Sequence, residues 1–393
     1  MSQELINRSA DLKRLRDDGY DIAITDGYLL LKRVPYVNAR REIQYGTLVS
    51  KLRLAGDVTD RPDDHVAYFA GDHPCHMNGS EILGIKHGSE VKTLAPGVVV
   101  NHSFSNKPPN GYEDYHAKMT RYETIIAGPA EAIDANVTAR VFPVVEAEEH
   151  ESVFKYIDTA SSRAGIATTT KKLELGKIAI VGLGGTGSYV LDLVAKTPVK
   201  EVHLFDGDQF SQHNAFRSPG AASVDELRRR PTKVAFLKDK YSAMRRGIVD
   251  HADYVGAATL GQLEGMDFVF LCLDRGAAKR IIVTKLEELG ASFIDVGMGI
   301  ELAGDALLGL IRTTTSTPAS RLQFTANARI PFQNGGAENE YSTNIQTADL
   351  NALNAALAVI KWKKLYGFYV DLENEHNSTY ITSGNELIND DQL

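Results

Sequence analysis

Residues 178–187 read Ile-Ala-Ile-Val-Gly-Leu-Gly-Gly-Thr-Gly, an apolar, β-branched run that leads directly into a glycine-rich turn. A second apolar run, Glu201–Phe205, ends at Asp206. A strand, a glycine-rich turn that opens a helix, and an acid after the next strand are typical of nucleotide binding in doubly wound α/β sheets. The helix start would offer N–H groups and a positive dipole end to a phosphate. The glycines expected to serve this site are Gly182, Gly184, Gly185 and Gly187.

Apolar strands and amphipathic helices alternate through the rest of this region. We expect strands at 177–181, 201–205, 250–255, 267–272 and 292–296, and helices at 188–195, 233–246 and 275–289. Alternation of this kind predicts a Rossmann-like α/β fold, a mostly parallel sheet with helices on both faces. Ligands of such sheets bind at the carboxyl ends of the strands, where the polar residues of this region gather.

The chain has 393 residues, which indicates more than one domain. Before residue 150, short strand-like runs are bounded by Gly, Pro, Asn and Asp and follow an opening helix at about 3–18. We therefore expect a separate N-terminal α+β domain at 1–150, which recruits a partner or carries a reactive cysteine. The α/β domain would span 151–375, and 376–393 would form a polar C-terminal tail.

Composition narrows the class of protein. No apolar run approaches the roughly 18 residues of a membrane helix, and the first residues lack a signal-peptide pattern, so we expect a cytoplasmic protein without a membrane partner. The net charge of -8 gives no global reason to expect nucleic-acid binding. The basic cluster Arg228–Arg230 is more typical of a solvated helix face than of an RNA site. Two cysteines, Cys75 and Cys272, allow neither a disulfide framework nor a four-cysteine zinc site.

Polar residues beyond Asp206 indicate a phosphate chain rather than a redox dinucleotide. Asp208, Asn214 and Arg217 follow the second strand, and Arg217 carries a planar cationic fork suited to phosphate oxygens. Lys233 opens a helix, where a cation is unfavourable to the dipole unless a ligand compensates. The structural alternatives are a turn cap for Asp206 and ordinary surface positions for the others.

Asp274 follows the apolar strand 267–272. A carboxylate at this edge could hold Mg²⁺ against the nucleotide, since that ion prefers one or two carboxylates together with substrate phosphates. The alternative is a helix N-cap, and both roles are compatible.

These residues together resemble the ThiF, MoeB and ubiquitin-activating-enzyme superfamily over about 160–370. The resemblance rests on 182–187, on Asp206 with Asp208, Asn214 and Arg217, on Lys233, on Leu273–Asp274 and on the helix-like segment 344–357. It implies that Asp206 binds the ribose, that Arg217 and Lys233 contact the triphosphate of ATP, that Asn214 orients the site and that Asp274 binds Mg²⁺. Arg163 matches an arginine that reaches the ATP of a partner subunit, which would make the enzyme a homodimer.

The family reaction is adenylation of the C-terminal glycine carboxylate of a ubiquitin-like or sulfur-carrier protein, with a conjugating enzyme as a further partner. Paired Cys-x-x-Cys motifs are absent, Asp274 is followed by Arg275 rather than the usual Asn, and the crossover segment 313–336 has no cysteine. Cys272 lies within an apolar strand and is interpreted as core. Cys75, between His73 and His76, remains a candidate for thioester formation, because histidines can lower a thiol pKa or share a metal.

Three hypotheses stay open from the sequence. The leading one is activation of a ubiquitin-like or sulfur-carrier protein. The second applies the same adenylation to a small molecule or a modified tRNA base, as in the tRNA-dehydrating relatives. The third is a non-catalytic nucleotide-binding scaffold or a dehydrogenase. The activated acyl group, the pathway and the role of 1–150 do not follow from these residues.

Overall fold

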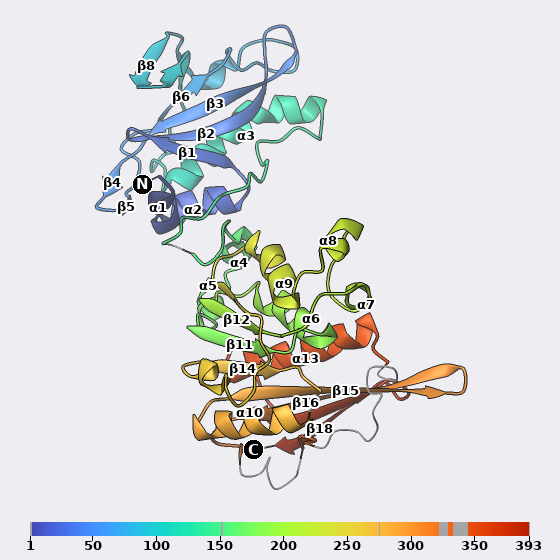
Figure 1. Cartoon of the computed structure of the whole chain (residues 1–393). Helices are drawn as coiled ribbons and strands as arrows, with labels where there is room; N and C mark the ends of the chain where they lie inside the picture. Colours follow the sequence, from blue (N-terminus) through green and yellow to red (C-terminus); the bar gives the residue numbers. More distant parts are fainter. Residues whose placement is uncertain (1, 151, 275, 322–328, 333–344, 393) are drawn as a thin grey trace. The chain divides into compact units, whose positions relative to one another are not determined.

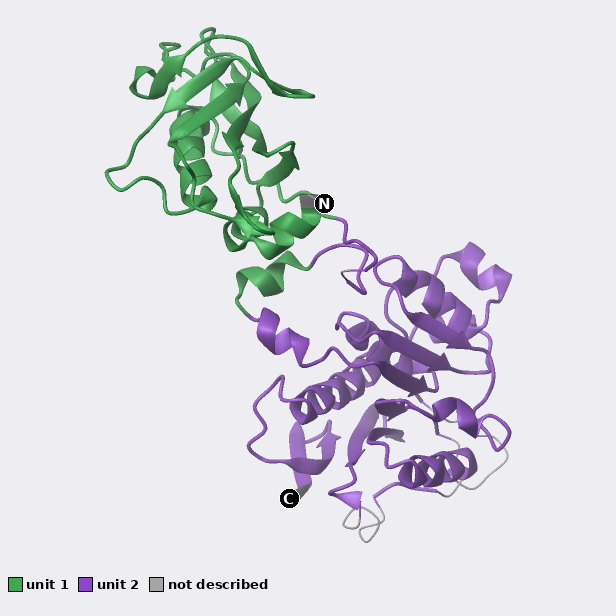
Figure 2. Cartoon of the chain, turned by 90° about the vertical axis from the view of Figure 1, so that its left-hand side faces the viewer, with its two compact units in different colours: residues 1–145, 158–165 green, residues 146–157, 166–393 purple. Residues whose placement is uncertain are grey.

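The computed structural model describes residues 2–150, 152–274, 276–321, 329–332 and 345–392. It divides into two compact units, residues 1–145 with 158–165 and residues 146–157 with 166–393 (Figure 2). The expected boundary at residue 150 therefore falls inside a segment of the second unit, while 158–165 belong to the first.

The first unit is built on an antiparallel sheet with the strand order β1-β2-β3-β6-β10-β7. Its helical elements are α1 (Ser2–Arg8), α2 (Ala10–Asp17), α3 (Tyr115–Ile133), α4 (Thr159–Arg163) and a short 3-10 turn (Leu83–Ile85). Its strands are β1 (Asp21–Thr25), β2 (Tyr28–Val37), β3 (Ile43–Lys51), β4 (Leu54–Ala55), β5 (Val58–Thr59), β6 (Val66–Ala70), β7 (Lys86–Gly88), β8 (Lys92–Ala95), β9 (Val98–Val100) and β10 (His102–Ser105).

Helices α1 to α3 share one core with this sheet, and Figure 1 shows α3 lying along it. Leu15 of α2, Leu31 of β2 and Tyr122 of α3 are fully buried in that core. The helix expected at 3–18 is interrupted at Ser9, whose backbone is extended. The break divides the amphipathic segment into two short helices.

The second unit contains the predicted mostly parallel sheet, which confirms the expected fold class. Its helical elements are α5 (Ala167–Lys171), α6 (Gly185–Val194), α7 (Gln212–Ala215), α8 (Val224–Arg229), α9 (Lys233–Ser242), α10 (Gly276–Glu288), α13 (Ala348–Leu365) and a 3-10 turn (Leu260–Leu263). Its strands are β11 (Lys177–Val181), β12 (Glu201–Phe205), β13 (Ile248–His251), β14 (Phe268–Leu271), β15 (Phe293–Ala303), β16 (Ala306–Ser316), β17 (Glu375–Ile381) and β18 (Glu386–Gln392).

The strand order β13-β12-β11-β14-β15 places a topological switch point between β11 and β14. These five strands pair in parallel, and from β11 the chain builds first toward β13 and then, from β14, in the opposite direction. Ligands of open α/β sheets bind at the carboxyl edge beside such a point. The glycine turn follows β11, and Asp274 follows β14, so both lie at this edge.

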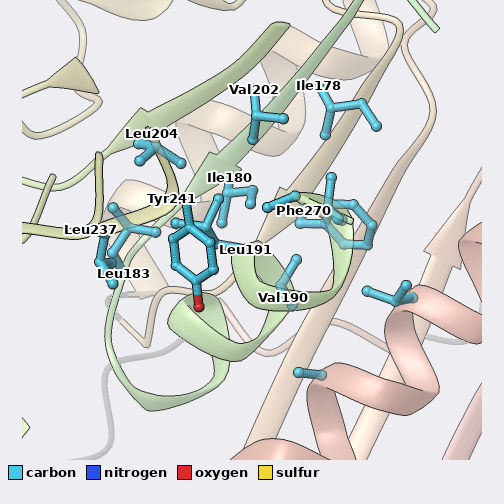
Figure 3. Packing of buried hydrophobic residues seen from close by; sticks show 14 of the residues in the cluster. Ile178, Ile180, Leu183, Val190, Leu191, Val202, Leu204, Leu237, Tyr241 and Phe270 are labelled. Carbon is cyan, nitrogen blue, oxygen red and sulfur yellow. The ribbon is translucent and has the colours of Figure 1, made fainter. Parts of the chain in front are cut away.

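Alternate residues of the parallel strands enter two cores, as a sheet covered on both faces requires. Ile178 and Ile180 of β11 pack with α6, α9 and α13, whereas Ala179 and Val181 pack with α10. Figure 3 shows the first core, in which side chains of β11, β12 and β14 meet those of α6 and α9. Near-continuous apolar strands are thus explained by burial on both sides.

The C-terminal residues differ from the expected polar tail. β17 and β18 extend the sheet beyond β15 and β16, and these four strands pair antiparallel. Glu375, His376 and Asn377 of β17 are buried, whereas residues 386–388 of β18 are exposed, which is compatible with a sheet edge that meets solvent. Across the described ranges, no helix is long and apolar enough to cross a membrane.

Candidate functional site

The glycine turn joins β11 to α6 at the switch point. Gly182 has a φ of 88°, and a Cβ built on it would lie 2.7 Å from a carbonyl oxygen that follows β14. A Cβ on Gly185 would lie 2.3 Å from a side chain of α13, and one on Gly187 would lie 1.9 Å from a carbonyl oxygen within the turn. A Cβ on Gly184 would meet no described atom within 4 Å. Three glycines therefore serve close packing, and Gly184 presents bare backbone to open space at the start of α6.

Helix α13, which is distant in the sequence, contacts the glycine turn. Thr186 Oγ1 donates a hydrogen bond of 2.8 Å to Asn351 Oδ1, and Asn351 Nδ2 donates one of 2.8 Å to the carbonyl oxygen of Thr347. Asn351 is 1% exposed. The segment 344–357 of the resemblance thus contributes a fixed contact to the turn, although Asn344 itself lies outside the described residues.

Asp206 links the second strand to the glycine turn. Its Oδ2 accepts a hydrogen bond of 2.7 Å from the backbone N–H of Leu183, and its Oδ1 accepts one of 2.9 Å from the N–H of Asp208. The residue is 7% exposed. A buried carboxylate that accepts two backbone N–H bonds is held in one orientation, and its Oδ1 keeps a further lone pair for a ligand.

Lys233 forms ion pairs with two carboxylates of the segment that follows β12. Its Nζ lies 3.3 Å from Asp206 Oδ2 and 2.7 Å from Asp208 Oδ2, and its backbone N–H donates to the carbonyl oxygen of Asp208. The hydroxyl of Tyr254 donates to the other oxygen of Asp208. Lys233, 6% exposed, thus has two carboxylates near its ammonium, which resolves the unfavourable position of a cation at the start of α9.

The segment after β12 places further polar groups beside this cluster. Asn214 is 2% exposed; its Oδ1 accepts from the N–H of Ser211, while its Nδ2 has no hydrogen-bond partner among the described residues. Ser218, 7% exposed, likewise has an unpartnered hydroxyl within the described part of the chain. Burial lowers the pKa of His213, and the charges of Arg217 and Lys233 lower it further. Two buried polar groups and a local positive field suit an anionic ligand.

Asp274 is exposed in the segment between β14 and α10. It lies at the same sheet edge as the glycine turn, since Val181 and Leu271 are paired at the ends of β11 and β14. An exposed carboxylate at this edge of the sheet fits Mg²⁺, which takes few protein ligands. Arg275, which replaces the usual Asn, lies outside the described residues.

A buried ionic cluster lies behind the start of α10. Asp295 of β15 is fully buried; its Oδ1 lies 2.7 Å from Lys279 Nζ and its Oδ2 lies 2.6 Å from Arg312 Nη2. Arg312 also donates to the carbonyl oxygen of Arg329. These contacts tie α10, β15 and β16 together beside the segment that carries Asp274.

Cys75 does not have the environment expected of a reactive thiol. It is fully buried in the first unit, its Sγ donates to the carbonyl oxygen of His73, and its backbone pairs with Val37 and Glu81. Burial raises the pKa of the Cys75 thiol, and the carboxylates of Glu81 and Asp72 raise it further. The expectation that neighbouring histidines lower this pKa is therefore corrected. Among the described residues, no group of three or more His, Cys, Asp or Glu could hold a metal.

The second cysteine does not have the environment of a reactive thiol either. Cys272 packs at the margin of the first core, and burial raises its thiol pKa, an effect that Asp295 strengthens. Residues 313–316 belong to β16 and are buried, whereas 322–328 and 333–336 lie outside the described residues.

Arg163 ends α4 in the first unit. It is exposed, and its guanidinium lies 6.0 Å from the ring centroid of Phe142. The structure thus brings Asp206, Asp208 and Lys233 into direct contact, but it places Arg163 and Cys75 in the other unit.

Tyr254 and Ser218 lie at the candidate site without a recognisable signal in the sequence, and the sequence gives no role to Asn351. Tyr254 was assigned to a strand at 250–255, but β13 ends at His251, so Tyr254 lies in the loop beyond the carboxyl edge. A lone aromatic residue after a short strand carries no pattern of its own. Asn351 lies in the segment 344–357 of the resemblance, yet its contact with Thr186 spans 165 residues and has no local signal.

Two family models match this chain. Residues 158–361 match the ThiF family, and residues 10–159 match a family described as Domain of unknown function (DUF6791). Ubiquitin-like modifier-activating enzyme 5 of Gallus gallus is 27% identical over 150 residues, 35% of this chain and 38% of that protein. The Mus musculus protein of the same name is 27% identical over 153 residues, 35% of this chain and 37% of its own length. The match thus spans well under half of these curated relatives.

Solved structures that are similar to this chain include PaaA and the E. coli protein MccB with ATP. PaaA has a TM-score of 0.44 at 17% identity, covering 57% of this chain and 76% of its own. MccB with ATP has a TM-score of 0.43 at 17% identity, covering 57% and 66%. Because the ThiF match alone extends over more than half of the 393 residues, the chain belongs to the ThiF family.

Proposed function

We propose that this protein uses ATP to adenylate the C-terminal glycine carboxylate of a ubiquitin-like or sulfur-carrier protein and releases pyrophosphate. The observation that carries the proposal is the contact set at the switch point: Asp206 binds the glycine turn and Lys233 through the same carboxylate. These contacts hold together the backbone proposed to bind phosphate, the carboxylate proposed to bind the ribose and the cation Lys233. Membership of the ThiF family supports the same chemistry.

In the proposed reaction, a substrate carboxylate oxygen forms a bond to the α-phosphorus of ATP. The bond between that phosphorus and the bridging oxygen to the β-phosphorus breaks, and pyrophosphate leaves with the electron pair. A carboxylate is ionised at neutral pH, so no general base is required. The task of the protein is to hold the groups in line and to stabilise the phosphate charge.

Arg217 and Lys233 are the proposed cations of the site, and Asn214 a proposed neutral donor. The buried Nδ2 of Asn214 and hydroxyl of Ser218 gain partners if phosphate oxygens enter beside Arg217. Lys233 is shared between two carboxylates, so it can turn toward the triphosphate while one carboxylate still pairs with it. Asp274 is the proposed ligand of Mg²⁺, which when bound would neutralise part of the phosphate charge.

The acyl-adenylate is the proposed endpoint within this chain. A thioester requires an accessible thiolate, and both cysteines have raised thiol pKa values because of burial. Transfer of the acyl group would therefore pass to a separate acceptor, such as a conjugating enzyme or a sulfur donor.

The test is ATP–pyrophosphate exchange with labelled pyrophosphate and candidate ubiquitin-like proteins. We expect exchange that requires the terminal glycine of the partner and falls on the order of a hundredfold or more in Asp274→Ala, by analogy with other charge-stabilising contacts. Asp305→Ala, which removes an exposed carboxylate from the β15–β16 hairpin turn, is the matched control and should exchange normally.

Other outcomes select the alternatives. Exchange that depends on tRNA and ignores ubiquitin-like proteins would assign the site to a modified base. Tight binding of NAD without ATP binding would contradict adenylation altogether.

We further propose a homodimer in which Arg163 of each subunit serves the site of its partner. Arg163→Ala and Asp274→Ala should each be inactive alone. Mixed in equal amounts and allowed to exchange subunits, they should recover about one quarter of wild-type exchange, because half of the dimers would hold one intact site. No recovery, with mixed dimers demonstrated by native mass spectrometry, would contradict the role in trans.

A further inference from the structure

Four strand ends lie in a row at the carboxyl edge of the parallel sheet. Val181 of β11 is paired with Leu271 of β14 and with Phe205 of β12, and Phe205 is paired with His251 of β13. Neighbouring strands in a sheet are about 4.8 Å apart. The segments that follow β14, β11, β12 and β13 are therefore successive steps along one edge.

This order gives a direction to a bound nucleotide, if the proposed adenylation holds. Asp274 and the glycine turn follow β14 and β11, where the phosphates and Mg²⁺ would lie. Asp206 follows β12, where the ribose would lie. The base, attached to the far side of the ribose, then extends toward the segment after β13, which contains Tyr254.

Tyr254 is held in place over the Asp206–Asp208 loop. A Cβ built on Gly207 would lie 2.8 to 3.0 Å from three carbons of the Tyr254 ring, so the ring covers this glycine and no side chain fits between them. The hydroxyl, which is bonded to one of these three carbons, donates to Asp208. The residue is nevertheless 54% exposed. An aromatic ring that is held by a close backbone contact and by its hydroxyl, and is still exposed, offers a surface on which a planar ligand can stack.

We infer that Tyr254 is the platform for the adenine base and that Asp208 is a positioning residue rather than a ligand of ATP. Asp208 receives Tyr254 on one carboxylate oxygen and Lys233 on the other. It thereby couples the base platform to the cation proposed for the triphosphate. The ring determines affinity for the base, and the hydroxyl, through Asp208, determines the orientation of Lys233.

The test compares two ligands by calorimetry on the full-length protein: ATP, which has a base, and inorganic tripolyphosphate, which has none. Tyr254→Ala should weaken ATP binding by about five- to a hundredfold, the range for loss of one base–aromatic stack, and should weaken tripolyphosphate binding no more than Tyr254→Phe, which removes only the hydroxyl. Tyr254→Trp should restore ATP binding. Tyr254→Phe keeps the ring, so it should retain ATP affinity but lower the kcat of pyrophosphate exchange, because the hydroxyl no longer holds Asp208, the partner of Lys233.

Tyr156→Ala, which removes another exposed tyrosine of the same unit, is the control and should bind both ligands normally. Unchanged ATP binding in Tyr254→Ala would overturn the inference, as would an equal loss of both ligands, which would indicate general damage to the phosphate site. Failure of the wild-type protein to bind ATP would instead contradict the proposed function, on which this inference rests. Thermal unfolding of each variant establishes that the comparison is made on folded protein.

Discussion

Asp206→Asn tests whether one buried carboxylate holds the glycine turn after β11 and the loop after β12 together. The substitution keeps the shape of the side chain but replaces one acceptor oxygen with an NH₂ group. Asp206 now accepts N–H bonds on both oxygens, at 2.7 Å and 2.9 Å, so at least one buried N–H would face a second donor. An unsatisfied buried donor costs about 1–3 kcal/mol, and the weakened contact with Lys233 adds to this. We therefore expect the free energy of unfolding to fall by about 2–4 kcal/mol.

The second unit contains a fluorescent side chain that allows its unfolding to be followed separately from that of the first unit. The chain has one tryptophan, Trp362, which lies in α13 and is fully buried in the core of the second unit. Urea unfolding followed by Trp362 fluorescence therefore reports the second unit. With a denaturant slope of about 2–3 kcal/mol per molar, the midpoint should fall by about 1 M.

Asp225→Asn is the matched control. It removes a carboxylate that is 86% exposed and pairs with Arg228 at the surface, so the midpoint should hardly move. A midpoint shift in Asp206→Asn no larger than that of the control would refute the reasoning. Asp206 would then be a ligand-binding residue without a structural role in the turn.

Further expectations concern single positions. Gly184→Ala should fold normally and bind ATP more weakly, which calorimetry measures. Gly187→Ala should lower the midpoint of urea unfolding, because its Cβ would lie 1.9 Å from a backbone carbonyl oxygen. Burial and the ammonium of Lys361 lower the pKa of His376, so its protonation favours the unfolded chain. Stability of the second unit should therefore be full above the unfolded pKa of about 6.5 and decrease as pH falls below it, with a shallower decrease in His376→Gln. Cys75→Ser should leave pyrophosphate exchange unchanged, because the Cys75 thiol is buried and its pKa is raised. A thiol-sensitive adduct with the partner that forms in the wild-type protein and is lost in Cys75→Ser would contradict this expectation.

The parallel sheet was predictable because its signals are local. The apolar runs at β11, β12 and β14 reflect burial on both faces, and the glycine turn and Asp206 each follow a strand end. Element bounds were less predictable. β13 lies at 248–251 rather than 250–255, because its extent is set by pairing with β12 and not by its own composition. The final residues appeared to be a polar tail for the same reason: β17 and β18 are strands by virtue of pairing with β16 and each other.

The fold class of the second unit, the family resemblance and the set of polar residues at the carboxyl edge all follow from the amino-acid sequence alone. The tertiary structure decided how those residues are used. It divided the glycines into three that permit packing and Gly184, which faces open space, and it joined Asp206, Asp208 and Lys233 to Tyr254. It also showed that Cys75 is buried. Strand periodicity and turn chemistry act between near neighbours in the chain, whereas burial, ion pairing and the packing of a ring on a glycine depend on segments that only folding brings together.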